Sequence, residues 1–239
     1  MAARAGRHKP LMAPDIVRSA SAVTLLGGGK VDPRDLEEAL GHAPTLVAAD
    51  GGANLAAEMG HRPVAVIGDM DSIDSQILAA IPARRRHRIS EQETTDFDKA
   101  LRAISAPLVL GLGFTGARID HELAAFHSLL AHPARRCILI GEEDVIFLLP
   151  AALCLDLPEG ARLSLYPLAP SRITGRGLVW PLEALALAAG LRIGTSNAVR
   201  EGPVEISSDR PGALVLLERR HLEAAMEGLL GATLHSPPP

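Results

Sequence analysis

Residues 64–72 read Val-Ala-Val-Ile-Gly-Asp-Met-Asp-Ser, an apolar, β-branched run that ends in a glycine and two carboxylates. In an extended chain residues i and i+2 point to the same side, so Asp69 and Asp71 should face the same way. Neighbouring carboxylates repel each other unless a proton or a cation lies between them. Mg²⁺ commonly takes one or two carboxylates together with phosphate oxygens and water. The stretch therefore predicts either a strand that leads to a metal site or a strand that leads to a helix over 75–81 capped by Asp71 or Ser72.

Apolar runs and helical periodicity alternate on both sides of this stretch, up to about residue 142. That alternation is typical of a parallel sheet whose strands are connected by helices. Ligands of open α/β sheets bind where strands end, and Asp50, Asp69, Asp71 and Asp120 all follow predicted strands. We therefore expect these acids to form one site. The predicted strands are 22–26, 45–49, the apolar part of 64–72, 107–112, 136–141 and 145–149; the predicted helices are 32–40, 75–81, one beginning after Thr94 or Thr95, and 122–130.

Glycines follow the first two predicted strands. Gly27-Gly28-Gly29 suggests a dinucleotide-binding turn, but the spacing Gly-x-Gly-x-x-Gly is not met from Gly27 onward, where Asp32 stands in place of the third glycine. The sequence also has no Gly-x-x-x-x-Gly-Lys-Ser/Thr phosphate loop. Gly51 and Gly52 come directly after Asp50, where glycines allow the backbone to approach a ligand closely.

Two further segments carry charged residues at helix starts. Asp96 and Lys99 lie at i and i+3 on one helix face. They form either a simple ion pair on the helix surface or a pair in which Asp96 binds a metal and Lys99 a phosphate. The loop 113–121 places two glycines, Arg118 and Asp120 at the start of a helix, a setting that suits a phosphate chain and its metal.

The pattern changes after Pro150, where short runs broken by proline and glycine predict strands without helices. We interpret this half as a β-sandwich. The expected division is an α/β catalytic domain at 15–148 and a β-sandwich at 149–232, with tails at 1–14 and 233–239. Residues 182–189 are apolar enough to resemble a helix and stay ambiguous. The predicted strands are 152–157, 161–166, 172–174, 191–194, 204–208 and 213–217, followed by a helix over 221–230.

Composition narrows the function classes. The net charge is −4, and the one basic run, 84–88, is short enough to be an exposed loop or an edge strand, so we expect no nucleic-acid partner. No apolar run reaches the ~18–20 residues that a membrane span needs, so we expect no membrane partner. Cys137 and Cys154 lie in apolar contexts without metal-ligand spacing. They are interpreted as buried thiols of a cytoplasmic protein.

Six motifs, taken together, resemble the thiamine pyrophosphokinase (thiamine diphosphokinase) family. They occur in the order typical of that family and span most of the chain between residues 45 and 217. Each is weak alone, whereas six in order are specific. The motifs are Ala-Asp-Gly-Gly-Ala-Asn at 49–54, Ile-Gly-Asp-Met-Asp-Ser-Ile at 67–73, Gln92 with Thr-Asp-Phe-Asp-Lys-Ala-Leu at 95–101, Thr-Gly-Ala-Arg-Ile-Asp-His at 115–121, Gly-Leu-Val-Trp-Pro-Leu at 177–182 and Thr-Ser-Asn at 195–197.

The resemblance implies an α/β catalytic domain, a C-terminal β-sandwich and a homodimer with thiamine bound at the subunit interface. It further implies Mg²⁺-dependent transfer of a pyrophosphoryl group from ATP to the thiamine hydroxyl. The loop departs from the family pattern at Phe114 and Ala117, which crowd the expected phosphate site. The implied site residues are Asp50, Asp71, Asp96 and Asp120 in catalysis, Asp69, Asp71 and Asp96 on the metal, Gln92, Lys99, Thr115, Arg118 and Asp120 on ATP, and Trp180, Ser196 and Asn197 on thiamine.

Two alternatives stay open at this point. The first keeps pyrophosphoryl transfer but changes the acceptor to another hydroxymethyl compound such as a pterin. The second is a non-catalytic regulator that binds a nucleotide. The number of acids, together with Lys99 and Arg118, favours an enzyme, because a simple binding protein does not need so many metal ligands.

Overall fold

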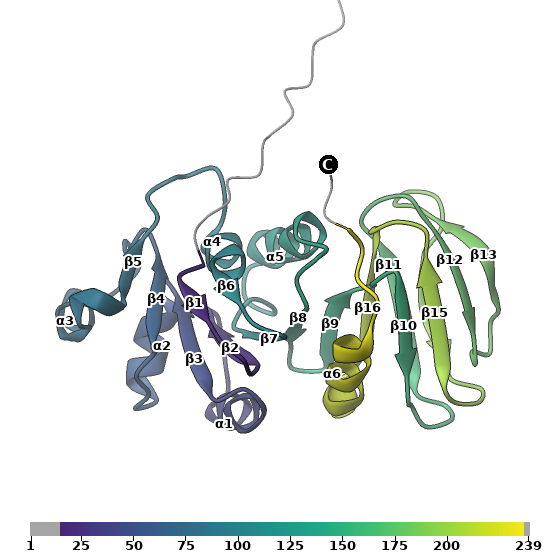
Figure 1. Cartoon of the computed structure of the whole chain (residues 1–239), viewed down its shortest axis with the longest axis horizontal. Helices are drawn as coiled ribbons and strands as arrows, with labels where there is room; N and C mark the ends of the chain where they lie inside the picture. Colours follow the sequence, from purple (N-terminus) through teal and green to yellow (C-terminus); the bar gives the residue numbers. More distant parts are fainter. Residues whose placement is uncertain (1–14, 237–239) are drawn as a thin grey trace, which may run out of the picture.

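The computed structural model describes residues 15–236, and the tail expected at 1–14 lies outside them. The first part of the chain alternates strands and helices, as predicted (Figure 1). Its elements are β1 (Val17–Arg18), β2 (Val23–Leu26), α1 (Pro33–His42), β3 (Thr45–Ala49), α2 (Gly52–Glu58), β4 (Ala65–Gly68), α3 (Ser75–Ala80), the 3-10 turn η1 (Ala83–Arg85), β5 (Arg86–Arg88), α4 (Asp96–Ala103), β6 (Ile104–Ser105), β7 (Val109–Leu112), α5 (Ile119–Ala131) and β8 (Cys137–Ile140).

The sheet of this first part is parallel. β2 pairs with β7 and β7 with β8, while β3, β4 and β5 form a second parallel set. β3 lies beside β2, so the two sets form one surface (Figure 1). Helices cover both of its faces, which is why strands such as Val23–Leu26 are buried along their whole length. The basic run at 84–88 begins in η1 and continues as the edge strand β5, one of the two placements that the sequence left open.

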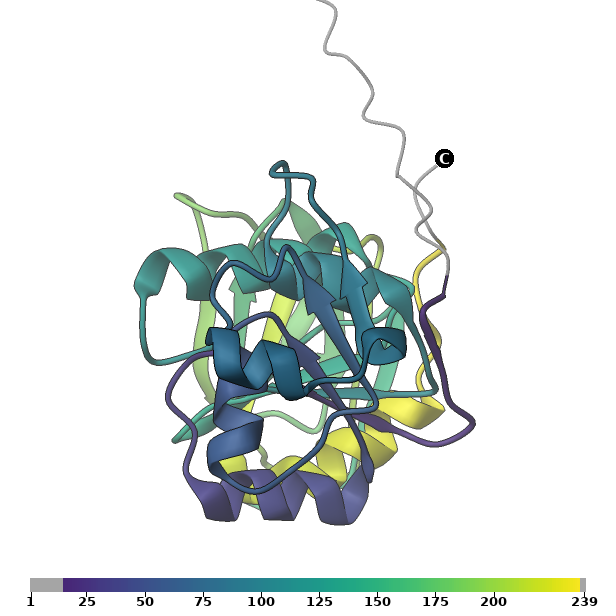
Figure 2. The same cartoon turned by 90° about the vertical axis from the view of Figure 1, so that its left-hand side faces the viewer.

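The helices form two layers, which Figure 2 shows above and below the sheet. α4 and α5 pack on one face through Phe97, Leu101 and Leu129. α1 and α2 pack on the other face through residues such as Leu36 and Ala56, in the cluster that continues into the C-terminal half. No helix in the part of the chain described here has the length and apolarity that crossing a bilayer demands.

The second part is all-β apart from its last helix. One antiparallel sheet has the strand order β10-β15-β12-β13, and it packs on strands β11 and β16 to enclose the sandwich core. The elements are β9 (Asp144–Leu148), β10 (Ala152–Leu155), β11 (Arg162–Pro167), β12 (Ser171–Arg176), β13 (Leu182–Leu187), β14 (Gly194–Ala198), β15 (Val204–Ser208), β16 (Ala213–Glu218), the 3-10 turn η2 (Arg219–His221) and α6 (Leu222–Gly231).

The two parts share a sheet. β9 pairs antiparallel with β8 on one side and with β16 on the other. The seven-stranded order is β14-β11-β16-β9-β8-β7-β2, so the parallel sheet continues into one layer of the sandwich. The expected division near residue 148 therefore falls within a hydrogen-bonded sheet, and it stays a proposal about folding units.

Four sequence-based expectations in the second part need comment. The ambiguous segment 182–189 contains a strand, β13. The strand expected at 191–194 is wrong: Leu191 lies in a turn with 88% of its surface exposed, and the strand begins only at Gly194. Cys154 is exposed rather than buried, because it lies on the outward-facing side of β10. Thr233 pairs with Ala152 and His235 is buried, so the chain packs on the sandwich through residue 235 instead of leaving it as a tail.

Candidate active site

The carboxyl ends of β2, β3 and β7 meet at one edge of the sheet. A Cβ atom built on Gly52 would lie 2.1 Å from the carbonyl oxygen of Leu26, and one built on Gly27 would lie 2.8 Å from that of Gly113. Only glycine allows the start of α2 to approach β2 so closely. Gly51 and Gly52 were expected to let the backbone approach a ligand, but in the structure Gly52 allows close packing of the α2 backbone on the β2 backbone.

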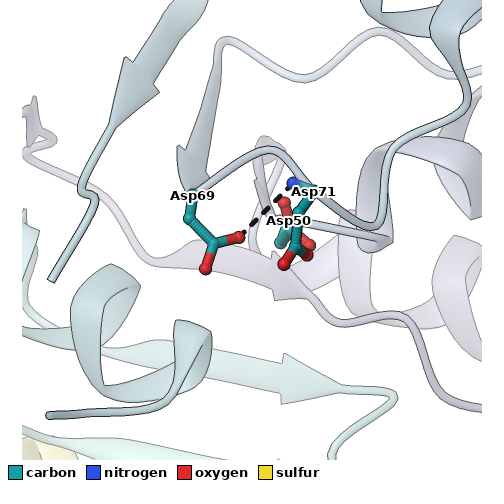
Figure 3. A group of neighbouring side chains, drawn as sticks. All are labelled: Asp50, Asp69 and Asp71. Atoms are coloured by element: carbon teal, nitrogen blue, oxygen red, sulfur yellow. Dashed lines mark hydrogen bonds between the residues drawn. The ribbon is translucent and has the colours of Figure 1, made fainter. Parts of the chain in front are cut away.

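Three carboxylates converge at this edge. Asp50 follows β3, while Asp69 and Asp71 follow β4 at the spacing of two that the sequence predicted. Oxygens of the three side chains lie within 4.8 Å of one another (Figure 3). The backbone is left-handed at Asp50, with φ 40°, and at Met70, with φ 68°. Such strain persists only where the surrounding structure enforces it, and it is typical of functional sites.

Gly68 makes the convergence possible. A Cβ atom on this residue would lie 2.8 Å from Cβ of Asp50 and 3.2 Å from an oxygen of Asp96. Any side chain here would push those two acids aside. The glycine of the opening stretch is therefore required by the carboxylates that surround it.

The loop after β4 supports the carboxylates. The N–H of Ser72 donates to Oδ2 of Asp50 at 3.2 Å, and its hydroxyl donates to Oδ1 of Asp71 at 2.9 Å. Oδ1 of Asp50 is buried and has no hydrogen-bond partner within residues 15–236. An unpartnered buried carboxylate oxygen is costly, and a cation would satisfy it. Three carboxylates with one orphan oxygen therefore fit a hard cation such as Mg²⁺.

The alternative in which Asp71 or Ser72 caps the helix after β4 is wrong. Asp74 caps α3, because its Oδ1 accepts from the N–H of Gln76 at 2.8 Å and from that of Ile77 at 3.4 Å. Asp71 and Ser72 lie before this cap and are free for the site.

Helix α4 brings a cation to the carboxylates. Thr95 is its N-cap, accepting from the N–H of Asp98. Lys99 is buried, and its Nζ lies 3.1 Å from Oδ1 of Asp96 and 3.7 Å from Oδ2 of Asp69. The ion pair expected within the helix is therefore present, and Lys99 also reaches Asp69, in the loop after β4.

The two acids next to Lys99 differ in their pKa. A hydrogen bond of 2.9 Å from Nε2 of Gln92 is the largest influence on Asp69, and with Lys99 it lowers the pKa of that carboxyl despite its burial. Burial is the largest influence on Asp96 and raises the pKa of that carboxyl; together with the smaller effects of the Asp50 and Asp69 charges it outweighs the opposing effect of Lys99. Asp96 is thus the acid of this site that holds a proton more readily than usual.

The loop after β7 and the first turn of α5 carry the other predicted ATP contacts. Arg118 and Asp120 are exposed and form a two-pronged ion pair, with the shorter contact at 2.6 Å. Asp120 therefore lies outside the group of three carboxylates. Phe114 packs on Phe97 of α4, with ring centroids 4.5 Å apart, so its ring belongs to the core rather than to the loop surface. Thr115 lies next to Gly141, at the end of β8.

The predicted thiamine contacts lie on the sandwich. Trp180 has 59% of its surface exposed and precedes β13, while Ser196 and Asn197 belong to β14. Asn197 is buried and bonds to the backbone of Trp180. The N–H of Ser196 donates to the hydroxyl of Ser164 at 2.9 Å, and the residue has a left-handed φ of 61°. These three residues lie together, apart from the acids.

Sequence reasoning missed two residues that hold the site. Ser72 supports two of the carboxylates, as described above. Asn54 donates to the carbonyl of Ser72 at 2.9 Å and accepts from the N–H of Asp74 at 2.9 Å, so it links α2 to the loop after β4. Both stand inside the quoted motifs, but spacing alone cannot show that the Asn54 side chain bonds to a loop eighteen residues away or that the N–H of Ser72 bonds to Asp50.

Comparisons with known proteins agree on one family. The family model "Thiamin pyrophosphokinase, catalytic domain" matches residues 36–140, and "Thiamin pyrophosphokinase, vitamin B1 binding domain" matches residues 153–212. Thiamine pyrophosphokinase 1 of Arabidopsis thaliana is 30% identical over 70% of this chain and 76% of its own length. The enzyme of the same name from Oryza sativa subsp. japonica is 32% identical over 68% of this chain and 75% of its own.

Solved structures show the same architecture. A protein from Lactobacillus plantarum superposes with a TM-score of 0.70 at 28% identity, covering 84% of this chain and 99% of its own. Thiamin pyrophosphokinase from Candida albicans superposes with a TM-score of 0.69 at 16% identity, covering 84% of this chain and 92% of its own. At that identity the match supports the fold alone. With both halves of the sequence matched and the acids in place, the chain belongs to the thiamine pyrophosphokinase family.

Proposed function

We propose that this chain transfers a pyrophosphoryl group from ATP to the hydroxyl of thiamine and releases thiamine diphosphate and AMP. The observation that carries the proposal is the convergence of Asp50, Asp69 and Asp71 beside the buried Lys99, in a member of this family. Transfer of phosphoryl-type groups depends on positioning and on neutralising charge more than on covalent chemistry. Acids that hold a cation, next to a fixed ammonium group, supply both.

Asp50, Asp69 and Asp71 are the residues that we assign to Mg²⁺. This assignment exchanges Asp96, the third ligand expected from the resemblance, for Asp50, whose orphan oxygen supports the change. When bound, the ion would neutralise charge on the phosphate oxygens of ATP. Asp96 is then left next to Lys99, where its raised pKa suits it to accept the hydroxyl proton of the acceptor.

The basic and polar groups around the acids fit the phosphates. Lys99 is held by two carboxylates and provides a fixed positive charge beside the metal ligands. Arg118 is exposed, so it can exchange Asp120 for a phosphate at little cost, since exposed ion pairs contribute ~0–1 kcal/mol. Gln92 and Thr115 lie on the loops that flank this space, and we assign them to ATP as well.

We assign thiamine to the sandwich, at an interface between two copies of the chain. Trp180 is hydrogen-bonded to Asn197 of β14, the strand at one end of the seven-stranded sheet. Asp50 follows β3, which lies beyond the strand at the other end of that sheet. Strands are spaced by about 4.8 Å, so the seven steps between them span roughly 30 Å. One chain cannot close that distance over a single substrate, which supports a homodimer in which each site uses both subunits. The exposed indole can stack on an aromatic or cationic ring for ~0.5–2 kcal/mol.

The test is to incubate the full chain with ATP, Mg²⁺ and thiamine and to identify both products by mass spectrometry. We expect AMP and thiamine diphosphate, and neither without Mg²⁺. ADP with thiamine monophosphate would contradict the pyrophosphoryl assignment. Product formed from a hydroxymethylpterin but not from thiamine would favour the alternative acceptor, and no product from either would favour a nucleotide-binding regulator.

The two free thiols of the described chain support our further proposal of a cytoplasmic location.

A further inference from the structure

Glu91 organises the loop between β5 and α4. Its carboxylate accepts four hydrogen bonds: from the N–H groups of Glu93 and Thr94, at 2.8 and 3.1 Å, from the hydroxyl of Thr94, and from Arg102. Burial alone would raise the pKa of Glu91, but these hydrogen bonds outweigh it and lower the pKa to about 2. The side chain therefore folds residues 91–94 into a closed turn.

Arg102 anchors this turn to helix α4. Its Nη2 donates to Oε1 of Glu91 at 2.6 Å, and its Nη1 lies 4.0 Å from Asp98. The Arg102 and Glu91 side chains are 13% and 28% exposed, so the pair is shielded from solvent far more than an ordinary surface ion pair. Neither side chain contacts the three carboxylates, and the catalytic scheme above uses neither.

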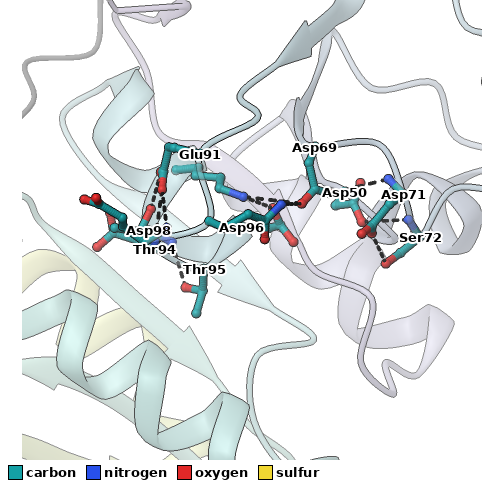
Figure 4. A network of polar contacts seen from close by, with 12 residues as sticks. Asp50, Asp69, Asp71, Ser72, Glu91, Thr94, Thr95, Asp96 and Asp98 are labelled. Atoms are coloured by element: carbon teal, nitrogen blue, oxygen red, sulfur yellow. Dashed lines mark hydrogen bonds and ion pairs between the residues drawn. The ribbon is translucent and has the colours of Figure 1, made fainter.

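The turn leads into the acidic site on both sides. Gln92 follows Glu91 directly and donates to Oδ2 of Asp69 at 2.9 Å. After the turn, α4 presents Lys99 to the same oxygen of Asp69 at 3.7 Å. Figure 4 shows the group around Glu91 at one end of this polar network and the carboxylates of Asp69, Asp50 and Asp71 at the other. Gln92 is exposed, so without the turn little else would fix its side chain.

We propose that the Glu91–Arg102 ion pair is a positioning device that holds Gln92 against Asp69 and so sets the orientation of this carboxylate for a divalent cation. The inference rests on the proposed function in that it uses the same metal site. Residues that orient a metal ligand typically change metal affinity or activity by ~10–100-fold when they are replaced. Glu91 and Arg102 would thus act on the metal through Gln92, without touching it.

The experiment measures Mn²⁺ binding to the full chain by the EPR signal of the free ion, without ATP or thiamine. We expect Glu91→Gln, Arg102→Met and Gln92→Ala each to weaken Mn²⁺ binding by about 10-fold. Because the three side chains act in series, the double variant Glu91→Gln/Gln92→Ala should bind Mn²⁺ no more weakly than either single variant. The parent affinity does not depend on turnover, so the result holds even if the chain forms no thiamine diphosphate.

A matched control separates positioning from stability. Asp35→Asn breaks the Asp35–Arg219 pair, whose contact of 2.9 Å and exposures of 29% and 18% resemble those of Glu91–Arg102. It should lower the free energy of unfolding comparably and leave Mn²⁺ binding unchanged. A milder variant, Thr94→Val, is used if the Glu91 or Arg102 variants fail to fold. It removes one hydrogen bond to Glu91 and keeps the ion pair, and it should weaken Mn²⁺ binding severalfold.

Three results would overturn the inference. The first is a Mn²⁺ affinity within twofold of the parent in the folded Glu91, Arg102 or Thr94 variants. The second is an additive loss in the Glu91/Gln92 double variant. The third is a parent chain that does not bind Mn²⁺ at all.

Discussion

The side-chain amide of Asn197 brackets the backbone of Trp180. Its Nδ2 donates to the Trp180 carbonyl at 2.8 Å, and its Oδ1 accepts from the Trp180 N–H at 3.1 Å. Oδ1 also accepts from the N–H of Ala198. Asn197 is buried and backbone groups engage most of its amide, so within one chain it fixes the backbone at Trp180, whose indole is exposed.

Asn197→Ala should loosen that indole. Two backbone groups of Trp180 lose the partner of a partly buried hydrogen bond, and each loss lowers the free energy of unfolding by no more than about 1–3 kcal/mol. Trp180 is the single tryptophan of the chain, so its fluorescence anisotropy reports on this loop without interference. We expect the anisotropy to fall and the KM for thiamine to rise. Unchanged anisotropy in a folded variant would show that other contacts hold Trp180.

Asp71→Asn should abolish most of the turnover and leave the fold intact. Asp71 is exposed, and substitutions of exposed residues usually change stability by no more than about 0.5 kcal/mol. Removing the charge of a metal ligand should reduce kcat by at least roughly 100-fold, as the loss of other electrostatic stabilisers does. Thermal unfolding followed by circular dichroism is the control. Normal turnover at ordinary Mg²⁺ would remove Asp71 from the site.

Mixed dimers test whether each site is built from two chains. Asp71→Asn and Trp180→Ala homodimers should both be poorly active, because every site in them carries one defect. In a two-fold dimer with shared sites, the mixed dimer has one site with both defects and one with neither. It should therefore recover up to about half of the parent activity. Differently tagged chains are co-expressed, and the mixed dimer is purified and assayed.

Wild-type mixed dimers prepared in the same way are the control for the tags. If they are active while the Asp71/Trp180 mixed dimer is no better than its parents, each site lies within one chain.

The stability that Glu91 contributes should depend on pH in the acidic range. Its folded pKa of about 2 lies below its ordinary value of 4.5. A carboxyl whose pKa is lowered by folding contributes its full stability at pH values above its pKa in the unfolded chain. That contribution is lost as the pH falls toward its pKa in the folded chain. The difference in unfolding free energy between the parent and Glu91→Gln should therefore shrink between pH 4.5 and 2. Urea titrations across this range measure it, and a constant difference would contradict the lowered pKa.

The two cysteines should react differently with iodoacetamide. Cys154 is exposed on β10, whereas Cys137 is buried in β8, where burial raises the pKa of its thiol. Peptide mass spectrometry of the native protein should find Cys154 alkylated and Cys137 unmodified. Modification of both under native conditions would indicate that β8 opens readily.

Patterns local to the sequence predicted most of the fold. Strands such as Thr45–Ala49 and Val204–Ser208 were predicted with their observed bounds, because their apolar residues lie on covered surfaces. The strand predicted at 191–194 was wrong because an apolar residue in a turn, here Leu191, cannot be told from one in a strand by sequence alone. β1 and β6 are two residues each, too short for any periodicity.

For the site, sequence predicted which acids follow the strands but not how they group. Asp50 joins Asp69 and Asp71 because β3 and β4 are neighbours and Gly68 leaves room between them. Asp120 follows a strand equally well, yet it pairs with Arg118. Whether a residue lies at the correct strand end is visible in sequence, whereas its partner there depends on sheet order and on the path of the loops.

The pairing of β9 with both β8 and β16 has a mechanical consequence. A chain with two parts joined by a flexible linker can close on its substrate by hinge bending. Here a ladder of hydrogen bonds crosses the junction, so such bending would have to break it. The hydrogen-bonded sheet therefore disfavours hinge closure between the two parts, and in the homodimer that we propose, any closure over the substrates falls to the loops at the strand ends.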